Sequence, residues 1–147
     1  MVKAALSAML FTLLLGSVAV LARQGHDAGT HTHAQAAKMT NPVKPDAASV
    51  AAGHALFATH CASCHGPMAA GDGAQAPKFN PRPSNLADAA WKHGPSDGEV
   101  FMVIRNGIPK TSMSAFGRNQ KLTERQTWDV VNFVRSLGPK PDPAHAH

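Results

Sequence analysis

The sequence predicts an all-α protein, and two helix-start signals are the clearest evidence for this fold class. Ser96 is followed three residues later by Glu99, and Thr123 by Gln126, so that each pair forms a capping box. An amphipathic apolar pattern follows each pair. Strand signals are sparse, and the segments between the predicted helices are rich in glycine and proline. We expect these two helices to end at Gly107 and Gly138.

A further helix is expected earlier in the chain. Asp46 or Ser49 can cap its start, and it runs through Phe57 toward the cysteine pair. Gly53 lies inside this helix, where glycine is unfavourable, so we expect a second helix to cross closely there. A shorter turn is expected between Ser84 and Ala90.

The first 22 residues have the pattern of an export signal. Lys3 supplies a positive start, and an apolar run extends from Ala4 to Ala22. The small-x-small rule allows cleavage after Ala19 or Ala22, but the run is also close to the roughly 20 residues that span a bilayer. We expect an exported protein whose N-terminal segment is either removed or kept as a membrane anchor.

The rest of the chain divides into three parts by composition. Residues 23–45 are polar and read as a flexible linker, residues 46–139 form one small domain, and residues 140–147 are expected to be a disordered tail. The histidines of the linker and tail could bind a transition metal loosely, or they could simply be solvated. They are His26, His31, His33, His145 and His147.

The two cysteines of the chain belong to the pentapeptide Cys61-Ala-Ser-Cys64-His65. C-x-x-C-H is the attachment motif of c-type haem, in which each thiol forms a thioether and the histidine binds the iron. The same cysteine spacing serves zinc binding and disulfide exchange. Here there is no second cysteine pair for zinc, and the helical surroundings do not match the βαβ context of a redox motif. The motif predicts one covalently bound haem c, which would also fill part of the small core.

Two of the six methionines are placed to bind the far face of the iron. Met102 lies within a predicted helix, where methionine is usually a flexible core residue. Met113 lies in a loop between predicted helices, and such a loop can cross the face of a ring. We therefore expect His65 and Met113 to be the two axial ligands.

Five sequence motifs together carry a family resemblance, and only the second is specific alone. They are Gly53-x-x-x-Phe57, Cys61-Ala-Ser-Cys64-His65-Gly66, Gly71-Asp-Gly73, Gly107-Ile-Pro-Lys-Thr-Ser-Met113 and Trp128-Asp-Val-Val-Asn-Phe133-Val-Arg135. In this order and spacing the chain from Gly53 to Leu137 resembles the class I cytochromes c, particularly small bacterial monohaem ones. The resemblance implies a helical cytochrome c fold wrapped around one haem. It also implies that the first and last helices cross near Gly53, with Trp128 or Phe133 packed there.

The resemblance also implies roles around the iron. It points to Met113 as the methionine ligand, and to the carbonyl of Pro77 as the acceptor for the second ring nitrogen of His65. Ser114 is a departure, because the family often has proline directly after the ligand, so the loop is expected to be looser. His93 or His60 could then compete for the iron, although both are more simply surface residues.

Three further residues are candidates for the haem pocket because their side chains can donate to propionates. Exposed charge or ordinary packing explains each of them equally well. They are Arg82, Trp91 and Arg105.

A haem closed by His65 and Met113 has no open coordination position, so we expect an electron shuttle and not an enzyme. Two alternatives remain open. The chain could be a haem-bearing subunit of a larger dehydrogenase or oxidase complex. If Met113 dissociates, it could instead be a ligand-binding haem sensor or peroxidase.

Lys and Arg outnumber Asp and Glu by 14 to 9, and cations gather around the expected haem edge. These cations are Lys78, Arg82, Lys110, Arg118 and Lys121. They predict redox protein partners, an electron donor and an acceptor, with acidic docking surfaces, although a merely solvated surface is the alternative. Nucleic acid is not expected as a partner, because the chain carries an export signal and no recognition motif. The expected location is the periplasm, or the outer face of the cytoplasmic membrane if the N-terminal segment is kept.

Overall fold

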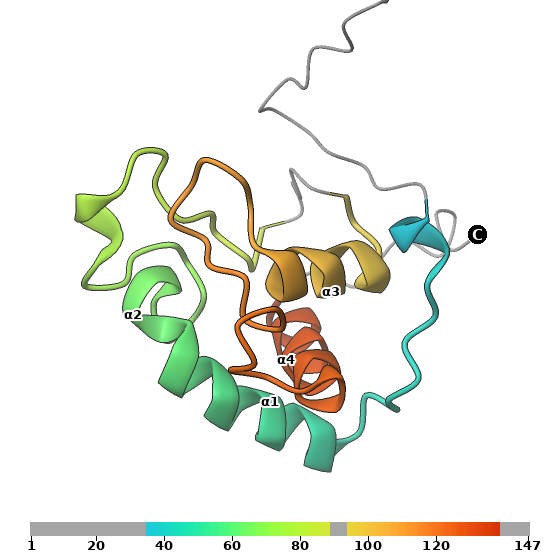
Figure 1. Cartoon of the computed structure of the whole chain (residues 1–147). Helices are drawn as coiled ribbons and strands as arrows, with labels where there is room; N and C mark the ends of the chain where they lie inside the picture. The colour runs from blue at the N-terminus through green and yellow to red at the C-terminus, as the bar shows by residue number, and fades with distance from the viewer. Residues whose placement is uncertain (1–34, 89–93, 139–147) are drawn as a thin grey trace, which may run out of the picture.

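A computed structural model describes residues 35–88 and 94–138 of the chain. Within these ranges every regular element is a helix, which confirms the all-α prediction (Figure 1). The elements are η1 (Ala36–Lys38), α1 (Ala47–His60), α2 (Ala62–His65), η2 (Ala76–Lys78), α3 (Asp97–Asn106) and α4 (Glu124–Leu137). The expected export signal and C-terminal tail lie outside the described residues. In the part of the chain that the structure describes, no helix has the length and apolarity needed to cross a membrane.

The three long helices begin where the sequence places them. Of the two residues expected to cap α1, Asp46 is the one that does so, accepting a hydrogen bond from the backbone N–H of Ser49 at 3.0 Å. Both predicted capping boxes are formed, at Ser96 for α3 and at Thr123 for α4. Each satisfies backbone N–H groups that the first turn of a helix leaves free. The helix starts therefore follow from local chemistry.

Helices α1 and α4 cross at Gly53, as expected (Figure 1). A Cβ atom at this position would lie 1.9 Å from the carbonyl oxygen of Asp129, so only glycine allows the two backbones to approach. The rings of Phe57 and Phe133 pack beside the crossing with their centroids 5.1 Å apart. Trp128 instead stacks on Phe101 of α3, with centroids 4.1 Å apart. Of the two aromatic residues expected at the crossing, Phe133 is the one that contacts α1.

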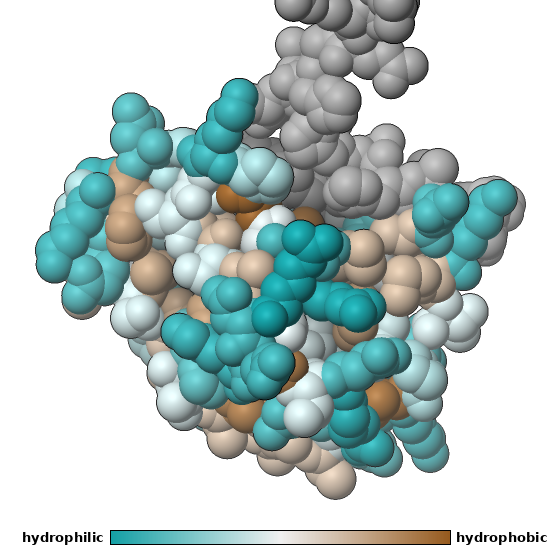
Figure 2. All heavy atoms as spheres, in the orientation of Figure 1, coloured by the Kyte–Doolittle hydropathy of each residue, from teal (hydrophilic) through white to brown (hydrophobic). Residues whose placement is uncertain are grey.

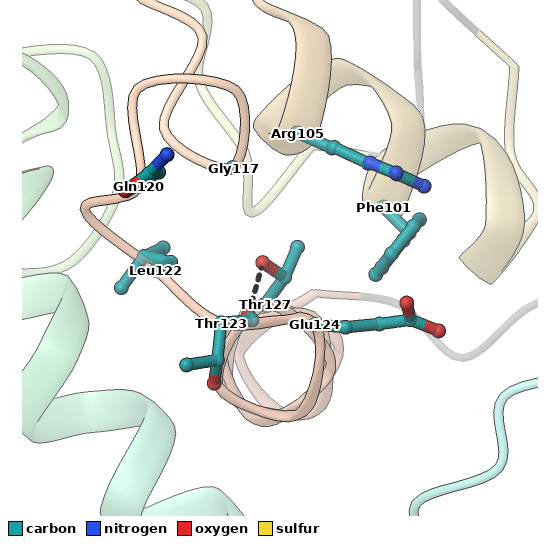
Figure 3. A pocket seen from close by; sticks show the side chains of 8 residues that line it. All are labelled: Phe101, Arg105, Gly117, Gln120, Leu122, Thr123, Glu124 and Thr127. Carbon is teal, nitrogen blue, oxygen red and sulfur yellow. Dashed lines mark hydrogen bonds between the residues drawn. The ribbon is translucent and has the colours of Figure 1, made fainter.

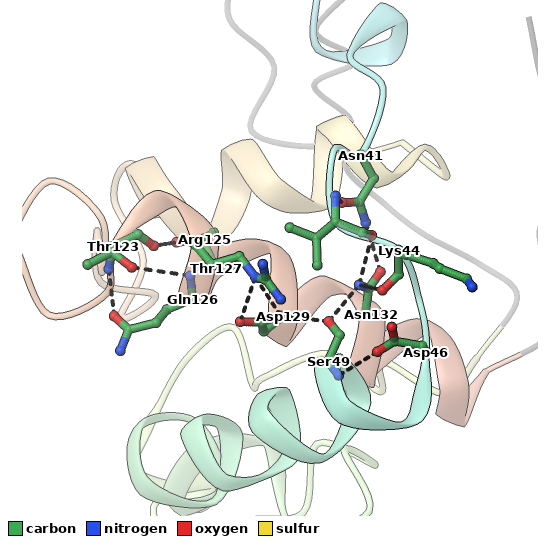
Figure 4. Close-up of polar contacts among 11 residues, drawn as sticks. Asn41, Lys44, Asp46, Ser49, Thr123, Arg125, Gln126, Thr127, Asp129 and Asn132 are labelled. Atoms are coloured by element: carbon green, nitrogen blue, oxygen red, sulfur yellow. Dashed lines mark hydrogen bonds and ion pairs between the residues drawn. The ribbon is translucent and has the colours of Figure 1, made fainter.

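A buried polar network ties α1, α4 and the segment before α1 together (Figure 4). The Ser49 hydroxyl donates to Asp129 at 2.6 Å, and the Asn132 amide donates to the Ser49 hydroxyl at 2.9 Å. The same amide donates to the Val43 carbonyl at 3.1 Å, while its oxygen accepts from Asn41 at 2.8 Å. Because buried polar groups cost free energy unless they are paired, this network specifies how the three segments meet.

The segment from residue 35 to residue 45, which we call the N-terminal arm, corrects the expected domain boundary. It was expected to belong to a flexible linker, but Ala36 and Val43 are buried and η1 packs on α3. A Cβ atom at Gly98 of α3 would lie 2.0 Å from the Ala36 carbonyl oxygen, so the arm lies directly against the helix backbone. Polar composition suggested a linker because only two side chains of the arm, those of Ala36 and Val43, are buried. Residues 23–34 of the expected linker lie outside the described residues.

The described part of the segment between η2 and α3 contains no helix. A turn was expected between Ser84 and Ala90, and over the described part of that range the chain bends at residues 86–88. This stretch runs close to the loop that follows α2, where the Leu86 N–H donates to the Ala69 carbonyl at 2.7 Å. Gly71 permits the approach, because a Cβ there would meet the Pro83 carbonyl oxygen at 2.5 Å.

Candidate haem-attachment site

The two cysteines lie at the junction where α1 passes into α2. Cys61 is buried and Cys64 is half-buried, and both thiols are free. One helical turn separates them, with the Cys64 N–H donating to the Cys61 carbonyl at 3.1 Å. Burial raises the pKa of the Cys61 thiol to about 12, and the neighbouring Cys64 adds to the shift. The Cys61 thiol is therefore neutral at physiological pH.

His65 ends α2, and its ring is held by a backbone carbonyl. Its Nδ1–H donates to the Ser84 carbonyl at 3.1 Å. Burial lowers the pKa of the imidazole, and the hydrogen bond to Ser84 opposes this shift. The neutral ring is the form that binds iron, and its Nε2 has no partner among the described residues. The ring is thus oriented with one nitrogen available for a metal.

Ser84 corrects the expected partner of His65. The carbonyl of Pro77 was expected to accept from the ring, but Pro77 lies in η2 and the Ser84 carbonyl takes this place. The sequence carried a weak signal, because Pro83 precedes Ser84 and favours extended backbone. Its position opposite His65 depends on the packing of residues 83–86 against Gly71, which no local pattern reveals. Pro77 as a residue of the haem pocket stays a prediction.

The loop after α2 folds back against the attachment motif through two glycines. Gly66 has φ +78°, which turns the chain directly after His65. At Gly73 a Cβ atom would lie 2.5 Å from the Ser63 carbonyl oxygen, and the Gly73 N–H donates to the Cys64 carbonyl at 3.2 Å. The loop therefore pairs carbonyls at the end of α2 that the short helix leaves free.

Met113 lies in the loop between α3 and α4, as expected, and is half-buried against the core. Its carbonyl oxygen accepts from the Ile108 N–H at 3.1 Å and packs on Gly107, where a Cβ would lie 2.5 Å away. The competing Met102 lies on α3, where the Asn106 amide donates to its sulfur at 3.8 Å. The Met102 sulfur thus contacts its own helix. Met113 as the iron ligand stays a prediction.

The remaining pocket candidates are dispersed. Arg82 is exposed, and Trp91 and His93 lie outside the described residues. Arg105 lines a cavity of about 280 Å³ between α3 and the start of α4 (Figure 3). None of the residues of the attachment motif lines this cavity, and neither does Met113. Roles for the three side chains toward haem propionates stay predictions.

His60 precedes Cys61 and packs near Phe116, with ring centroids 6.2 Å apart. Among residues 35–88 and 94–138, no cluster of three or more His, Cys, Asp or Glu side chains is placed to hold a metal ion. The zinc alternative for the cysteine pair therefore receives no support from the described part of the chain. The linker histidines lie outside it.

The donor set of this site fits haem c. Two unpaired thiols one helical turn apart can form the two thioethers, and the adjacent neutral imidazole presents a free Nε2. Helical fold and site together define a protein that carries covalently attached haem. The family model described as Cytochrome c matches residues 50–138, and the chain belongs to this family.

Curated relatives of the chain include subunits of Cbb3-type cytochrome c oxidases. The Cbb3-type cytochrome c oxidase subunit CcoP of Azospirillum sp. (strain B510) is 35% identical over 102 residues, covering 63% of this chain and 32% of the relative. Subunit FixP of the same oxidase type in Bradyrhizobium sp. (strain ORS 278) is 37% identical over 98 residues, covering 62% of this chain and 31% of the relative. The chain thus spans about a third of the length of the curated relatives that it matches.

Two solved structures share the fold. A cytochrome cL from Methylophaga aminisulfidivorans superposes with a TM-score of 0.52 at 26% identity, covering 63% of this chain and 55% of that one. A chain of the Kuenenia stuttgartiensis reducing HAO-like protein complex gives a TM-score of 0.61 at 23% identity, covering 70% of this chain and 49% of that one. Both likenesses agree with a cytochrome c fold.

Proposed function

We propose that this chain is a monohaem c-type cytochrome that shuttles single electrons between redox proteins outside the cytoplasmic membrane. The observation that carries the proposal is the oriented, neutral His65 beside two free thiols. When bound, haem c supplies reversible one-electron chemistry at its iron. In this proposal Cys61 and Cys64 would hold the haem, and His65 and Met113 would be its iron ligands.

The protein groups around the iron have separate tasks in this proposal. The Ser84 carbonyl fixes the orientation of the His65 ring and increases its basicity through Nδ1. As the second iron ligand, Met113 would exclude substrates and water from the iron. Methionine ligation raises the reduction potential relative to a second histidine, which suits a carrier between a reductase and an oxidant. The chain is then a carrier and not an enzyme.

Exposed cations support docking to acidic redox partners. Lys110, Arg118 and Lys121 are exposed in the segment between Gly107 and α4, and Lys78 and Arg82 are exposed near η2. Hydrophilic side chains cover much of the face shown in Figure 2, with smaller hydrophobic areas between them. A positively charged surface speeds encounters with an acidic partner at low ionic strength.

The test is a pyridine haemochrome spectrum together with the intact mass of the purified exported protein. We expect one covalently attached haem, and in the ferric protein the weak red absorption band that methionine ligation produces. The mass also reports whether the N-terminal segment has been removed. A mass without haem, or carbon monoxide binding to the reduced protein as readily as to an open haem, would contradict the proposal.

A second function is favoured by the relatives, which are oxidase subunits. In this alternative the chain is a haem-bearing subunit of a larger oxidase or dehydrogenase, and it receives electrons within a stable complex. Purification from the native membrane under mild detergent separates the two functions. A free carrier elutes alone, whereas a subunit elutes with its complex and with oxidase or dehydrogenase activity.

A further inference from the structure

The Thr111 side chain links the two ends of the loop that carries Met113. The Thr111 hydroxyl donates to the Ile108 carbonyl at 2.8 Å and accepts from the Met113 N–H at 3.1 Å. A second link joins the same two ends, since the Ile108 N–H donates to the Met113 carbonyl at 3.1 Å. The hydroxyl thus uses its one proton and one of its lone pairs to bridge the start and the end of this short loop.

One residue of this loop has a strained backbone conformation. Lys110, directly before Thr111, has φ +61°, a conformation that a residue with a side chain adopts at a cost. Strained conformations persist only where surrounding contacts hold them. The residue after Met113 is Ser114, so no proline ring restricts the backbone there. The restraint on the Met113 N–H comes from Thr111.

We propose that Thr111 is a positioning residue for Met113. Its hydroxyl fixes the backbone on both sides of the loop and so limits the conformations that the methionine side chain samples. This inference rests on the proposed function, in which Met113 binds the iron. Without the hydroxyl, Met113 dissociates more often, because ligation must then also order the loop.

The experiment measures displacement of Met113 by imidazole in the purified ferric holoprotein. Imidazole is titrated while the weak red band of methionine ligation is followed, and the apparent imidazole affinity is compared among variants. Thr111→Val removes the hydroxyl and keeps the branched shape of the side chain. Thr111→Ala removes the hydroxyl and the branch together. Thr111→Ser keeps the hydroxyl. Thr59→Val is the matched control, because Thr59 is also exposed and donates to a carbonyl, that of Ala55 at 3.0 Å, but spans no loop.

We expect Thr111→Val and Thr111→Ala to raise the apparent imidazole affinity about tenfold, the loss expected for one or two solvent-exposed hydrogen bonds. Thr111→Ser and Thr59→Val should stay within about twofold of the unchanged protein by the same measure. A merely structural role would lower the melting temperature of Thr111→Val and leave the imidazole titration unmoved.

Three outcomes overturn the inference, and they are distinguishable. If Thr111→Val and Thr111→Ala titrate like the unchanged protein while the red band is present, Thr111 does not position Met113. If Thr59→Val shifts as much as Thr111→Val, the effect is not specific to the loop. If the unchanged ferric protein lacks the red band, methionine ligation itself fails, and the proposed function must be revised together with this inference.

Discussion

Met113 is the residue on which the expected properties of the iron depend most. Its backbone is fixed by Gly107, Ile108 and Thr111, whereas its sulfur is assigned from the loop position alone. A substitution at this position therefore tests the assignment directly.

We expect Met113→His to abolish the red band of the ferric protein and to lower the reduction potential. The shift should be on the order of 100 mV or more, because axial ligands set haem potentials over a range of about 0.8 V. Redox titration followed by visible absorbance measures it. Met102→Leu is the control, and it should leave both the band and the potential unchanged. A band that survives Met113→His but disappears in Met102→Leu would reverse the assignment.

Asn132 is the centre of the buried polar network. We expect Asn132→Ala to lower the free energy of unfolding by about 3 kcal/mol, because it removes several hydrogen bonds and leaves the buried Val43 carbonyl unpaired. Denaturant unfolding of the holoprotein followed by circular dichroism measures the loss. Asn119→Ala, at an exposed position, should change it by less than about 0.5 kcal/mol. Equal effects of the two substitutions would show that the network contributes little.

Among single residues, the sequence predicts those whose role depends on neighbours a few positions away in the chain. The attachment motif and the helix caps are defined by spacings of three or four positions, and the caps form as expected. The Ser84 carbonyl was missed because any residue has a carbonyl, and its approach to His65 depends on how a distant segment packs. The partners of Asn132 are likewise set by tertiary contacts some 80 to 90 positions apart.

At the scale of elements, Gly53 is the position where helix propensity and packing oppose each other. Alanine is favoured over glycine by up to about 1 kcal/mol within a helix. A Cβ at Gly53 would nevertheless lie 1.9 Å from a backbone atom of α4, which cannot move as a flexible side chain can.

We expect Gly53→Ala to destabilise the protein by at least about 2 kcal/mol, because forcing α1 and α4 apart costs more free energy than the higher helix propensity of alanine contributes. Thermal unfolding of the holoprotein measures the change. Ala52→Gly, at the exposed neighbouring position, reports propensity alone and should cost about 1 kcal/mol. A stabilised Gly53→Ala variant would mean that the close crossing is not maintained in solution.

The helices were predictable because each combines a cap with an apolar pattern, and the crossing was predictable from an otherwise unfavourable glycine. The N-terminal arm was not. Only Ala36 and Val43 are buried within it, and the arm is fixed to α4 through the carbonyl of Val43 and the side chain of Asn41. A segment with so few buried apolar side chains has the composition of a linker.

At the scale of the whole molecule, the net charge of +5 determines how the protein meets charged reactants. The exposed cations of the segment between Gly107 and α4 add a local attraction for anions to that of the net charge.

We expect the reduced protein to react with ferricyanide, an anion, several-fold faster at about 10 mM ionic strength than at about 150 mM, because salt screens the attraction. A cationic cobalt(III) oxidant should show the opposite trend. Lys110→Glu should weaken the salt dependence more than Lys44→Glu, a matched exchange at an exposed position in the arm. Stopped-flow absorbance measures the rates. Identical salt dependence in both variants would place the site of electron exchange away from the Met113 loop.

The pairing of α1 with α4 has a consequence for how the chain folds. Ser49 and Asp129, which meet in this pair, are 80 positions apart. Closing a loop of that length costs about 4 kcal/mol of chain entropy before any contact between the helices compensates for it. Helical proteins usually fold fast because their contacts are local, but here the decisive contact joins the two ends of the domain. We therefore expect slow, concerted folding, in which loss of either terminal helix unfolds the other.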